Sequence, residues 1–235
     1  MSEEANIVEK SWKDIYAEKK EAAALFQTKP RPIVEEFIAL LQERGGGELL
    51  DLGCGYGNYL PYFSRRGFSV IGSDISTIAL RVARKRLSRP NQDNICLILH
   101  DMRVLPFCDE SFVGIFSMNT IYHATMTEVQ RVVSEIYRVL KDKGVCLVTL
   151  LSDTDFKFDR TLLTGKKTLQ TDTEFEKGVV HSFFNREDAC ALLANFEIIK
   201  LEKEDIRFEN RVSSHWFALI RKNSPIGDDI TKHLS

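Results

Sequence analysis

Residues 48–60, "ELLDLGCGYGNYL", join an apolar segment to a helical pattern through three glycines in five positions. Glycine occurs where φ must be positive or where another molecule lies close to the main chain. The apolar segment predicts a short buried strand, and the residues after the glycines predict a helix. In open α/β sheets, ligands bind where a strand runs into such a loop and helix. Gly53, Gly55 and Gly57 therefore predict a ligand site.

The residues around the glycines narrow the choice of ligand. A dinucleotide fingerprint is G-x-G-x-x-G, whereas this segment reads D-x-G-x-G-x-G, with Asp51 two residues before the first glycine. A pyrophosphate binds to bare N–H groups, so a carboxylate at this position disfavours it. Asp51 is better placed for a positively charged ligand, or for an ordered water beside the ammonium of a zwitterion. A Walker loop is excluded because no G-K-[ST] follows.

Two more acids follow predicted strands. Asp74 ends the second strand, 23 positions after Asp51, where a carboxylate can accept both hydroxyls of a ribose. Asp101 closes the third strand in "HDMRVLPF". There it could accept from an exocyclic adenine amine, and the main chain at Met102 could complete recognition of the ring edge.

Apolar strands alternate with helical patterns along the first two thirds of the chain, which predicts a parallel sheet covered on both faces. After Leu151 this alternation stops. We expect a single α/β domain over residues 1–222 with a flexible tail at 223–235. Its parts are a helical N-terminal extension that acts as a lid (1–46), a core (48–151), a variable insert near the active site (152–184), and a helix capped by Asn185 with two closing strands.

The composition limits the function classes. The chain has 235 residues, 43% of them hydrophobic, and a formal charge of −2, so it carries no overall field for nucleic acid or anionic lipid. No signal peptide or membrane span is expected. The five cysteines show no CxxC pair, which predicts reduced thiols, a cytoplasmic location and no metal site. Cys54 is interpreted as a small loop residue, and the basic run Arg81–Arg89 as a solvated helix face.

Four motifs between Glu48 and Leu151 resemble those of the class I S-adenosylmethionine-dependent methyltransferases, of the small-molecule type with methyltransferase domains 11 and 25: "ELLDLGCGYGNYL", "VIGSDIS", "LHDMRVLPFCDESF" and "IYRVLKDKGVCLV". The resemblance implies a Rossmann-like, mostly parallel seven-stranded sheet with helices on both faces and an antiparallel last strand. It also implies S-adenosylmethionine as cofactor and S-adenosylhomocysteine as product. One departure is Phe112-Val113, where the family usually carries "FD". The cofactor-binding residues that the resemblance implies are Asp51, Gly53, Cys54, Gly55, Gly57, Asp74, Ile75, Asp101, Met102, Asn119 and Tyr16.

The expected reaction is a direct SN2 displacement, in which the protein aligns a nucleophile with the methyl group and excludes water. No triad is present, so any general base is sought among His123, His181 and Tyr16, with Tyr122 behind them. Aromatic residues of the N-terminal helix and the insert exit are the candidate pocket walls, with core packing as the alternative. These wall residues are Trp12, Tyr16, Tyr122, Phe183 and Phe184. His100 and His233 have no motif around them and are given no functional role, and His215, in a late strand, is interpreted as structural.

The acceptor is not specified by the sequence, and three functions stay open. The first is methyl transfer to a small molecule by a monomer or homodimer. The second is a tRNA-modifying methyltransferase, which would make tRNA a partner. The third is a non-catalytic protein that binds S-adenosylmethionine as a regulator or partner subunit.

Overall fold

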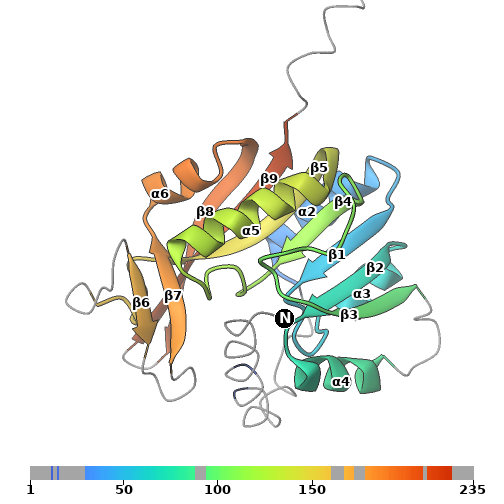
Figure 1. Cartoon of the computed structure of the whole chain (residues 1–235). Helices are drawn as coiled ribbons and strands as arrows, with labels where there is room; N and C mark the ends of the chain where they lie inside the picture. The colour runs from blue at the N-terminus through green and yellow to red at the C-terminus, as the bar shows by residue number, and fades with distance from the viewer. Residues whose placement is uncertain are drawn as a thin grey trace, which may run out of the picture.

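A mostly parallel sheet forms the centre of the molecule in the computed structural model (Figure 1). The structure describes residues 12, 15, 30–87, 94–159, 167–171, 178–208 and 211–223. The elements follow in the order α2 (Pro32–Gln42), β1 (Glu48–Leu52), α3 (Leu60–Arg65), β2 (Ser69–Asp74), α4 (Thr77–Arg86), β3 (Ile95–Leu99), β4 (Phe112–Ser117), α5 (Met126–Val139), β5 (Leu140–Ser152), β6 (Thr168–Thr171), β7 (Val179–Phe184), α6 (Arg186–Leu192), β8 (Phe196–Phe208) and β9 (Arg211–Lys222).

Seven of these strands form the sheet that the sequence predicts. β3, β2, β1, β4 and β5 are parallel neighbours in that order. β9 then pairs antiparallel with β5, and β8 pairs antiparallel with β9. The expected Rossmann-like sheet with an antiparallel last strand is therefore confirmed.

Two further strands lie in the segment 152–184, which is the predicted variable insert near the active site. β7 pairs in parallel with the end of β5, at Leu151–Phe183 and Ser152–Phe184, and β6 pairs antiparallel with β7. β4 leaves the same edge of β5 at Val148. β7 therefore continues the sheet directly beyond the end of β4, next to the loop that follows β4.

Helix ends follow the local capping chemistry. The Ser76 side chain accepts from the N–H of Ala79 at the start of α4. The predicted cap Asn185 forms a capping box with Asp188 at the start of α6. The sequence Ser11–Asp14 is also typical of a capping box, but it falls outside the described residues apart from Trp12, which is helical.

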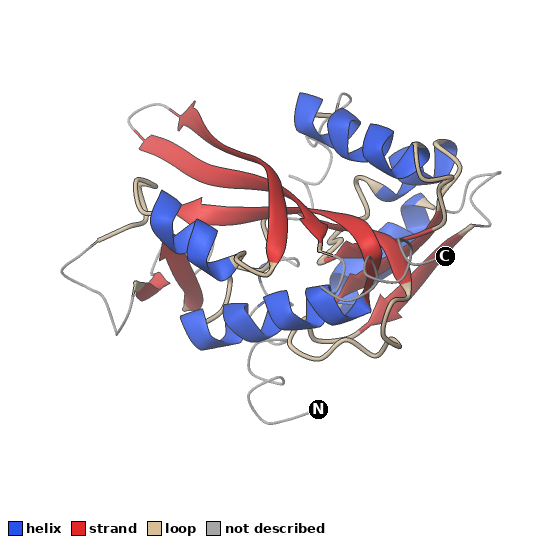
Figure 2. Cartoon of the chain, turned by 90° about the horizontal axis from the view of Figure 1, so that it is seen from above, coloured by secondary structure: helices blue, strands red, loops and turns tan. Residues whose placement is uncertain are grey.

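Helices cover both faces of the sheet (Figure 2). Alternate strand residues point to opposite faces, so Leu49 packs with α2 and α3 while Leu50 packs with α5. The departure at Phe112-Val113 falls on Val113, which packs against the apolar cluster of α2 and α3 on one face of the sheet. Phe112 is buried on the other face and meets Phe107 edge to face at 4.9 Å. The sheet is thus buried on both sides and presents its strand ends to solvent.

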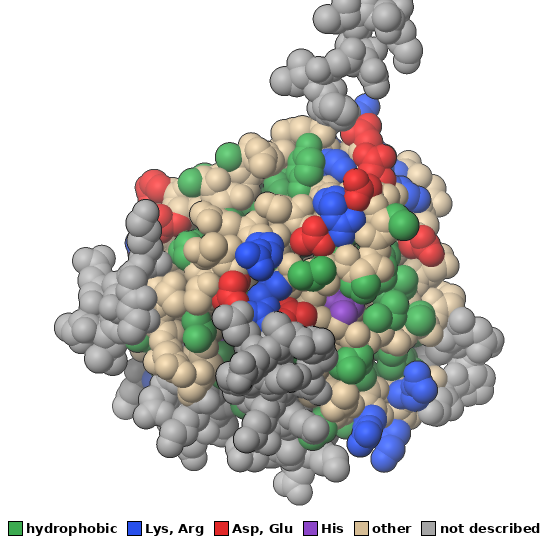
Figure 3. Space-filling model, in the orientation of Figure 1, with side chains coloured by type: hydrophobic (Ala, Val, Ile, Leu, Met, Phe, Trp, Pro, Cys, Tyr) green, Lys and Arg blue, Asp and Glu red, His purple; other side chains and the backbone are tan. Residues whose placement is uncertain are grey.

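The surface carries mixed charge over the face drawn in Figure 3, with Lys and Arg side chains gathered beside α4. Arg81, Arg84 and Lys85 of α4 are exposed, which agrees with the predicted solvated face. Among the described helices, none is both long and apolar enough to cross a lipid bilayer.

Candidate cofactor and acceptor site

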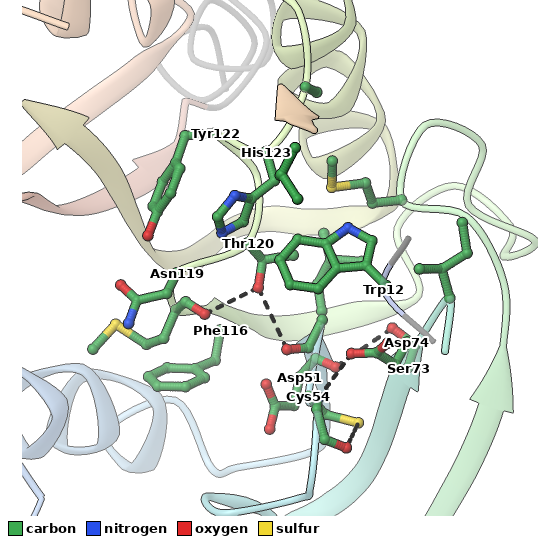
Figure 4. Close-up of a pocket in the computed structure, with 18 of the residues that line it drawn as sticks. Trp12, Asp51, Cys54, Ser73, Asp74, Phe116, Asn119, Thr120, Tyr122 and His123 are labelled. Atoms are coloured by element: carbon green, nitrogen blue, oxygen red, sulfur yellow. Dashed lines mark hydrogen bonds between the residues drawn. The ribbon is translucent and has the colours of Figure 1, made fainter. Parts of the chain in front are cut away.

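A cavity of about 830 Å³ opens at the carboxyl ends of β1, β2, β3 and β4 (Figure 4). Cavities that hold a small molecule span roughly 300–1,000 Å³. Figure 4 shows Asp51 and Asp74 on one side, Tyr122 and His123 on the other, and the Trp12 indole between them. The cavity is lined by most of the predicted cofactor residues, namely Asp51, Gly53, Cys54, Gly55, Asp74, Ile75, Asp101, Met102 and Asn119.

The glycine loop has the backbone that the sequence predicts. Gly53, Gly55 and Gly57 have φ values of 74°, 54° and 72°. A Cβ atom on Gly53 would lie 2.2 Å from the Thr120 Cγ2 atom, so the loop after β4 leaves no room for a side chain. Gly57 is different, because it packs against Leu60 and does not line the cavity. The structure therefore gives Gly57 a packing position rather than the predicted place at the cofactor.

Asp51 and Asp74 are two buried carboxylates behind this loop. Burial raises the pKa of the Asp51 carboxyl well above its usual range, and the Asp74 charge raises it further. The Asp74 carboxylate accepts from the N–H groups of Gly55 at 2.9 Å and Ser76 at 2.8 Å. Burial raises the pKa of Asp74 to about 6, against these backbone hydrogen bonds, which lower it. A cationic ligand near this pair would relieve their mutual repulsion.

Asp101 is held by an arginine that the sequence analysis did not single out. Arg103 donates from Nε to both carboxylate oxygens at 3.0 Å, and from a terminal nitrogen at 2.6 Å. Burial alone would raise the pKa of Asp101, but these hydrogen bonds outweigh it and lower the pKa overall. Arg103 also bonds Glu128, which completes the capping box of α5 with Thr125. The guanidinium thus joins the predicted adenine position to the helix that follows His123.

The loop after β4 crosses the cavity opposite the acids. Asn119 has a φ of 53°, and its N–H donates to the Thr149 hydroxyl at 2.7 Å. A positive φ in a residue other than glycine stores strain and often marks a functional site. Thr120 then bonds the carbonyl of Gly53 at 3.4 Å, and Tyr122 and His123 follow in the cavity wall. The loop therefore ties the glycine segment to the predicted catalytic side.

His123 is the predicted base that lines the cavity. Its ring lies 4.8 Å from Trp12, 4.4 Å from Tyr122 and 4.7 Å from His181, centroid to centroid. His181 itself is fully buried, bonds the Val179 carbonyl at 3.1 Å and does not line the cavity. The structure therefore places His181 behind His123, so that it can act on an acceptor only through that residue.

Two predicted wall residues are core residues instead. Phe183 and Phe184 are fully buried in the hydrophobic core, and neither lines the cavity. Their strand β7 pairs with β5, which turns both rings into the protein rather than toward a ligand. Trp12 and Tyr122 do line the cavity, whereas Tyr16 falls outside the described residues.

His215 is a cavity residue that the sequence analysis treats as structural. Its Nε2 lies 3.0 Å from the Tyr122 hydroxyl, and both residues line the cavity. The expected antiparallel direction of the last strand could have indicated this position. An antiparallel β9 brings its first residues to the carboxyl end of β5, where His215 faces Leu151. His100, which the sequence analysis gives no functional role, lies in the cavity wall at the end of β3.

These residues fit S-adenosylmethionine by their chemistry. Two buried carboxylates favour a cationic ligand, Asp74 can accept ribose hydroxyls, and Gly53 and Gly55 line the cavity with backbone that carries no side chain. The sheet order and the acids at three neighbouring strand ends resemble those of the class I S-adenosylmethionine-dependent methyltransferases, and residues 49–144 carry a methyltransferase domain.

Comparisons with known proteins support this class. Residues 49–144 match the family described as a methyltransferase domain. The chain is 32% identical over 114 residues to methyltransferase GfsG of Streptomyces halstedii, which covers 48% of this chain and 40% of that protein. It is 36% identical over 121 residues to a demethylmenaquinone methyltransferase of Symbiobacterium thermophilum, covering 48% and 46%. The matches thus span less than half the length of these two relatives.

Solved structures share the fold over most of the chain. An S-adenosylmethionine-dependent methyltransferase of Methanosarcina mazei has a TM-score of 0.70 at 20% identity, covering 84% of this chain and all of that one. The 1,6-didemethyltoxoflavin-N1-methyltransferase of Burkholderia thailandensis, solved with S-adenosylhomocysteine, has a TM-score of 0.65 at 14% identity, covering 94% and 90%. These structures show that the chain shares the fold of such methyltransferases, and S-adenosylmethionine with S-adenosylhomocysteine as product stays the predicted cofactor.

Proposed function

We propose that this protein transfers the methyl group of S-adenosylmethionine to a small-molecule acceptor by direct displacement. The observation that carries the proposal is one cavity with two unlike walls. Asp51, Asp74 and Asp101 lie at the carboxyl ends of three neighbouring parallel strands, and Tyr122 and His123 lie across from Asp51 and Asp74. Relatives named for demethylmenaquinone, sterols and phosphoethanolamine support a small-molecule acceptor.

The acidic wall accounts for cofactor binding. Asp74, oriented by the N–H groups of Gly55 and Ser76, accepts the ribose hydroxyls with the lone pairs that remain on its oxygens. Asp51 supplies negative charge on the side of the ammonium and the sulfonium. Asp101, fixed by Arg103, and the main chain at Met102 take the adenine edge. When bound, S-adenosylmethionine supplies a methyl group on a sulfonium, and the residues around it need only hold the reactants in line.

The opposite wall accounts for the acceptor. We call the surface formed by Trp12, Tyr122, His123, Val179 and His215 the acceptor side. Its rings and aliphatic groups exclude water from the reacting atoms and orient a small molecule against the methyl group. His123 is the predicted base with access to such a molecule. His181 supports its ring from behind.

Two measurements test this function. S-adenosylmethionine and S-adenosylhomocysteine should raise the melting temperature and NAD should not. Release of S-adenosylhomocysteine should be detected with at least one member of a library of small hydroxyl, amine and thiol compounds. A preference for NAD would end the methyltransferase assignment. Turnover only with bulk tRNA, together with a gel shift, would move the assignment to a tRNA-modifying enzyme, and cofactor binding without any turnover would favour a regulator.

A further inference from the structure

A hydrogen-bonded tyrosine–histidine pair lies on the acceptor side. The Tyr122 hydroxyl comes from the loop after β4, the His215 imidazole from β9, and the oxygen lies 3.0 Å from Nε2. Both side chains line the cavity. The two residues are 93 positions apart in sequence, so the pair exists only because β9 runs antiparallel beside β5.

The pair is held rigidly from three strands. The Tyr122 carbonyl accepts from the Ser182 N–H of β7 at 2.9 Å, and its ring lies 4.4 Å from the His123 ring. His215 lies opposite Leu151 of β5 on one side and opposite Glu204 of β8 on the other. Side chains directly opposite in an antiparallel pair lie on the same face of the sheet, so Glu204 is a neighbour of His215 there. The Glu204 carboxylate is ion-paired with Arg31, which also lines the cavity.

We propose, resting on the methyl-transfer function above, that this pair removes the proton from a planar acceptor that carries a weakly acidic hydroxyl, of the phenol or enol class. As the acceptor oxygen forms its bond to the methyl carbon and the sulfur–methyl bond breaks, the hydroxyl proton passes to the Tyr122 oxygen. The tyrosine proton passes in turn to Nε2 of His215. The positive charge that leaves the sulfonium ends on the imidazole, so atoms and charge balance.

The shape of the acceptor side points to a flat acceptor. Trp12 and His123 meet edge to face at 4.8 Å, and the Tyr122 ring is tilted by 47° against His123. Val179 and Val180 of β7 add aliphatic walls. Aromatic faces and aliphatic groups bind planar rings through apolar contact, with a few polar groups that fix orientation. The tyrosine hydroxyl is such a polar group, because it can accept one hydrogen bond while it donates another.

The experiment uses the full chain saturated with S-adenosylhomocysteine and 4-nitrophenol as the probe. Calorimetry measures affinity, and the absorbance of the phenolate reports proton loss at a pH where the unbound phenol is mostly protonated. 4-Nitroanisole is the matched ring without the proton, and 4-nitrobenzylammonium is the cationic alternative. The wild type should bind 4-nitrophenol about fivefold or more tighter than 4-nitroanisole, the effect of one good hydrogen bond, and should convert it to phenolate.

Three variants separate proton transfer from packing. Tyr122→Phe should abolish the preference for the phenol and the phenolate signal. His215→Gln should keep much of the binding but lose the phenolate signal, because an amide cannot take the proton. Tyr137→Phe, at a tyrosine that does not line the cavity, should change neither. Each variant is first shown to bind S-adenosylhomocysteine as the wild type does.

The possible results are distinct. Failure of the wild type to bind S-adenosylhomocysteine would overturn the methyl-transfer function itself. With normal cofactor binding, three results would overturn the present inference and leave the methyl-transfer function standing. These are no binding of 4-nitrophenol, binding without phenolate formation, and binding weaker than that of 4-nitroanisole or of the ammonium compound. The inference also fails if Tyr122→Phe or His215→Gln leaves the phenolate signal intact.

Discussion

Replacement of Asp74 by alanine separates ligand binding from folding more sharply than any other change in the cavity. The carboxylate has two tasks, since it accepts from the backbone of the glycine loop and of the α4 N-terminus, and it is the proposed partner of two ribose hydroxyls. Charge-assisted hydrogen bonds contribute about 1.5–3 kcal/mol each. Even one half of the summed contribution weakens binding by tenfold or more, and a loss of about 3 kcal/mol weakens it by about a hundredfold.

Two opposing effects act on the stability of the unliganded protein. Burial raises the pKa of Asp74 from 3.8 to about 6, and this shift costs the folded state about 3 kcal/mol at neutral pH. Asp74→Ala removes that cost. It also leaves the N–H groups of Gly55 and Ser76 without their acceptor, at about 1–3 kcal/mol each. The two effects oppose each other, so the net change lies within about −1 to +3 kcal/mol.

Asp155 offers a matched control. It is also a buried aspartate that accepts from two backbone N–H groups, those of Lys157 at 2.9 Å and Ser214 at 2.8 Å, but it does not line the cavity. Asp155→Ala should destabilise the protein and leave affinity for S-adenosylhomocysteine within about twofold of the wild type. The assay is isothermal titration calorimetry, with thermal unfolding alongside.

Ligand-induced stabilisation gives the same answer independently. At a ligand concentration of about 100 Kd, the wild type gains about 2.7 kcal/mol, which corresponds to about 5–10 °C for a chain of this size. At the same concentration, a hundredfold weaker Asp74→Ala variant gains only about 0.4 kcal/mol, or about 1 °C. Unchanged affinity in Asp74→Ala, or an equal loss in Asp155→Ala, would refute the assignment of the ribose to Asp74.

Three further predictions concern the same cavity. Affinity for S-adenosylmethionine should fall by up to about tenfold per pH unit below about pH 6, because protonation of Asp74 removes the charged acceptor. The contribution of this group to unliganded stability has the opposite sign, since it is present at low pH and is lost as pH rises through about 6. Calorimetry on the wild type and on Asp74→Asn measures affinity against pH, and equal slopes for the two proteins would contradict the prediction. Gly53→Ala should cost more stability and more cofactor affinity than Gly67→Ala, because both glycines have positive φ but only the first would place a Cβ against Thr120. Urea titration and calorimetry compare the two variants, and equal losses would show that backbone strain alone matters. Arg103→Met should weaken S-adenosylhomocysteine binding about three- to tenfold by releasing the carboxylate that the arginine holds, and undiminished affinity would remove the guanidinium from the cofactor site.

The cofactor half of the cavity could be predicted from sequence because its determinants are local. An apolar strand, a loop of glycines and an acid two residues before it follow one another in the chain, and Asp74 and Asp101 each end a strand of their own. Parallel strands bring such ends to one edge of the sheet, so the order of the motifs already implied their proximity. Among the predicted cofactor residues that the structure describes, Gly57 alone does not line the cavity, because it packs against Leu60.

The acceptor half could be predicted only in part, because its contacts join segments far apart in sequence. Tyr122 meets His215 through the antiparallel register of β9 with β5, which no local pattern encodes. Phe183 was expected in the cavity wall, yet pairing of β7 with β5 turns it into the core. Arg103 follows Asp101 by two residues, but its second contact, with Glu128, again depends on tertiary structure.

The junction at the end of β5 has a consequence for how new activities could arise in this scaffold. β7 is joined to β5 through only two residue pairs, whereas β1 is paired along its whole length with β2. Insertions, deletions or exchanges between Asp153 and Ser182 would therefore alter the acceptor side of the cavity. They would not break the strand pairings that position Asp51 and Asp74. A combinatorial library of substitutions confined to residues 153–182 would vary which acceptor is bound while cofactor binding is retained. Natural sequence divergence in this interval can change the acceptor in the same way.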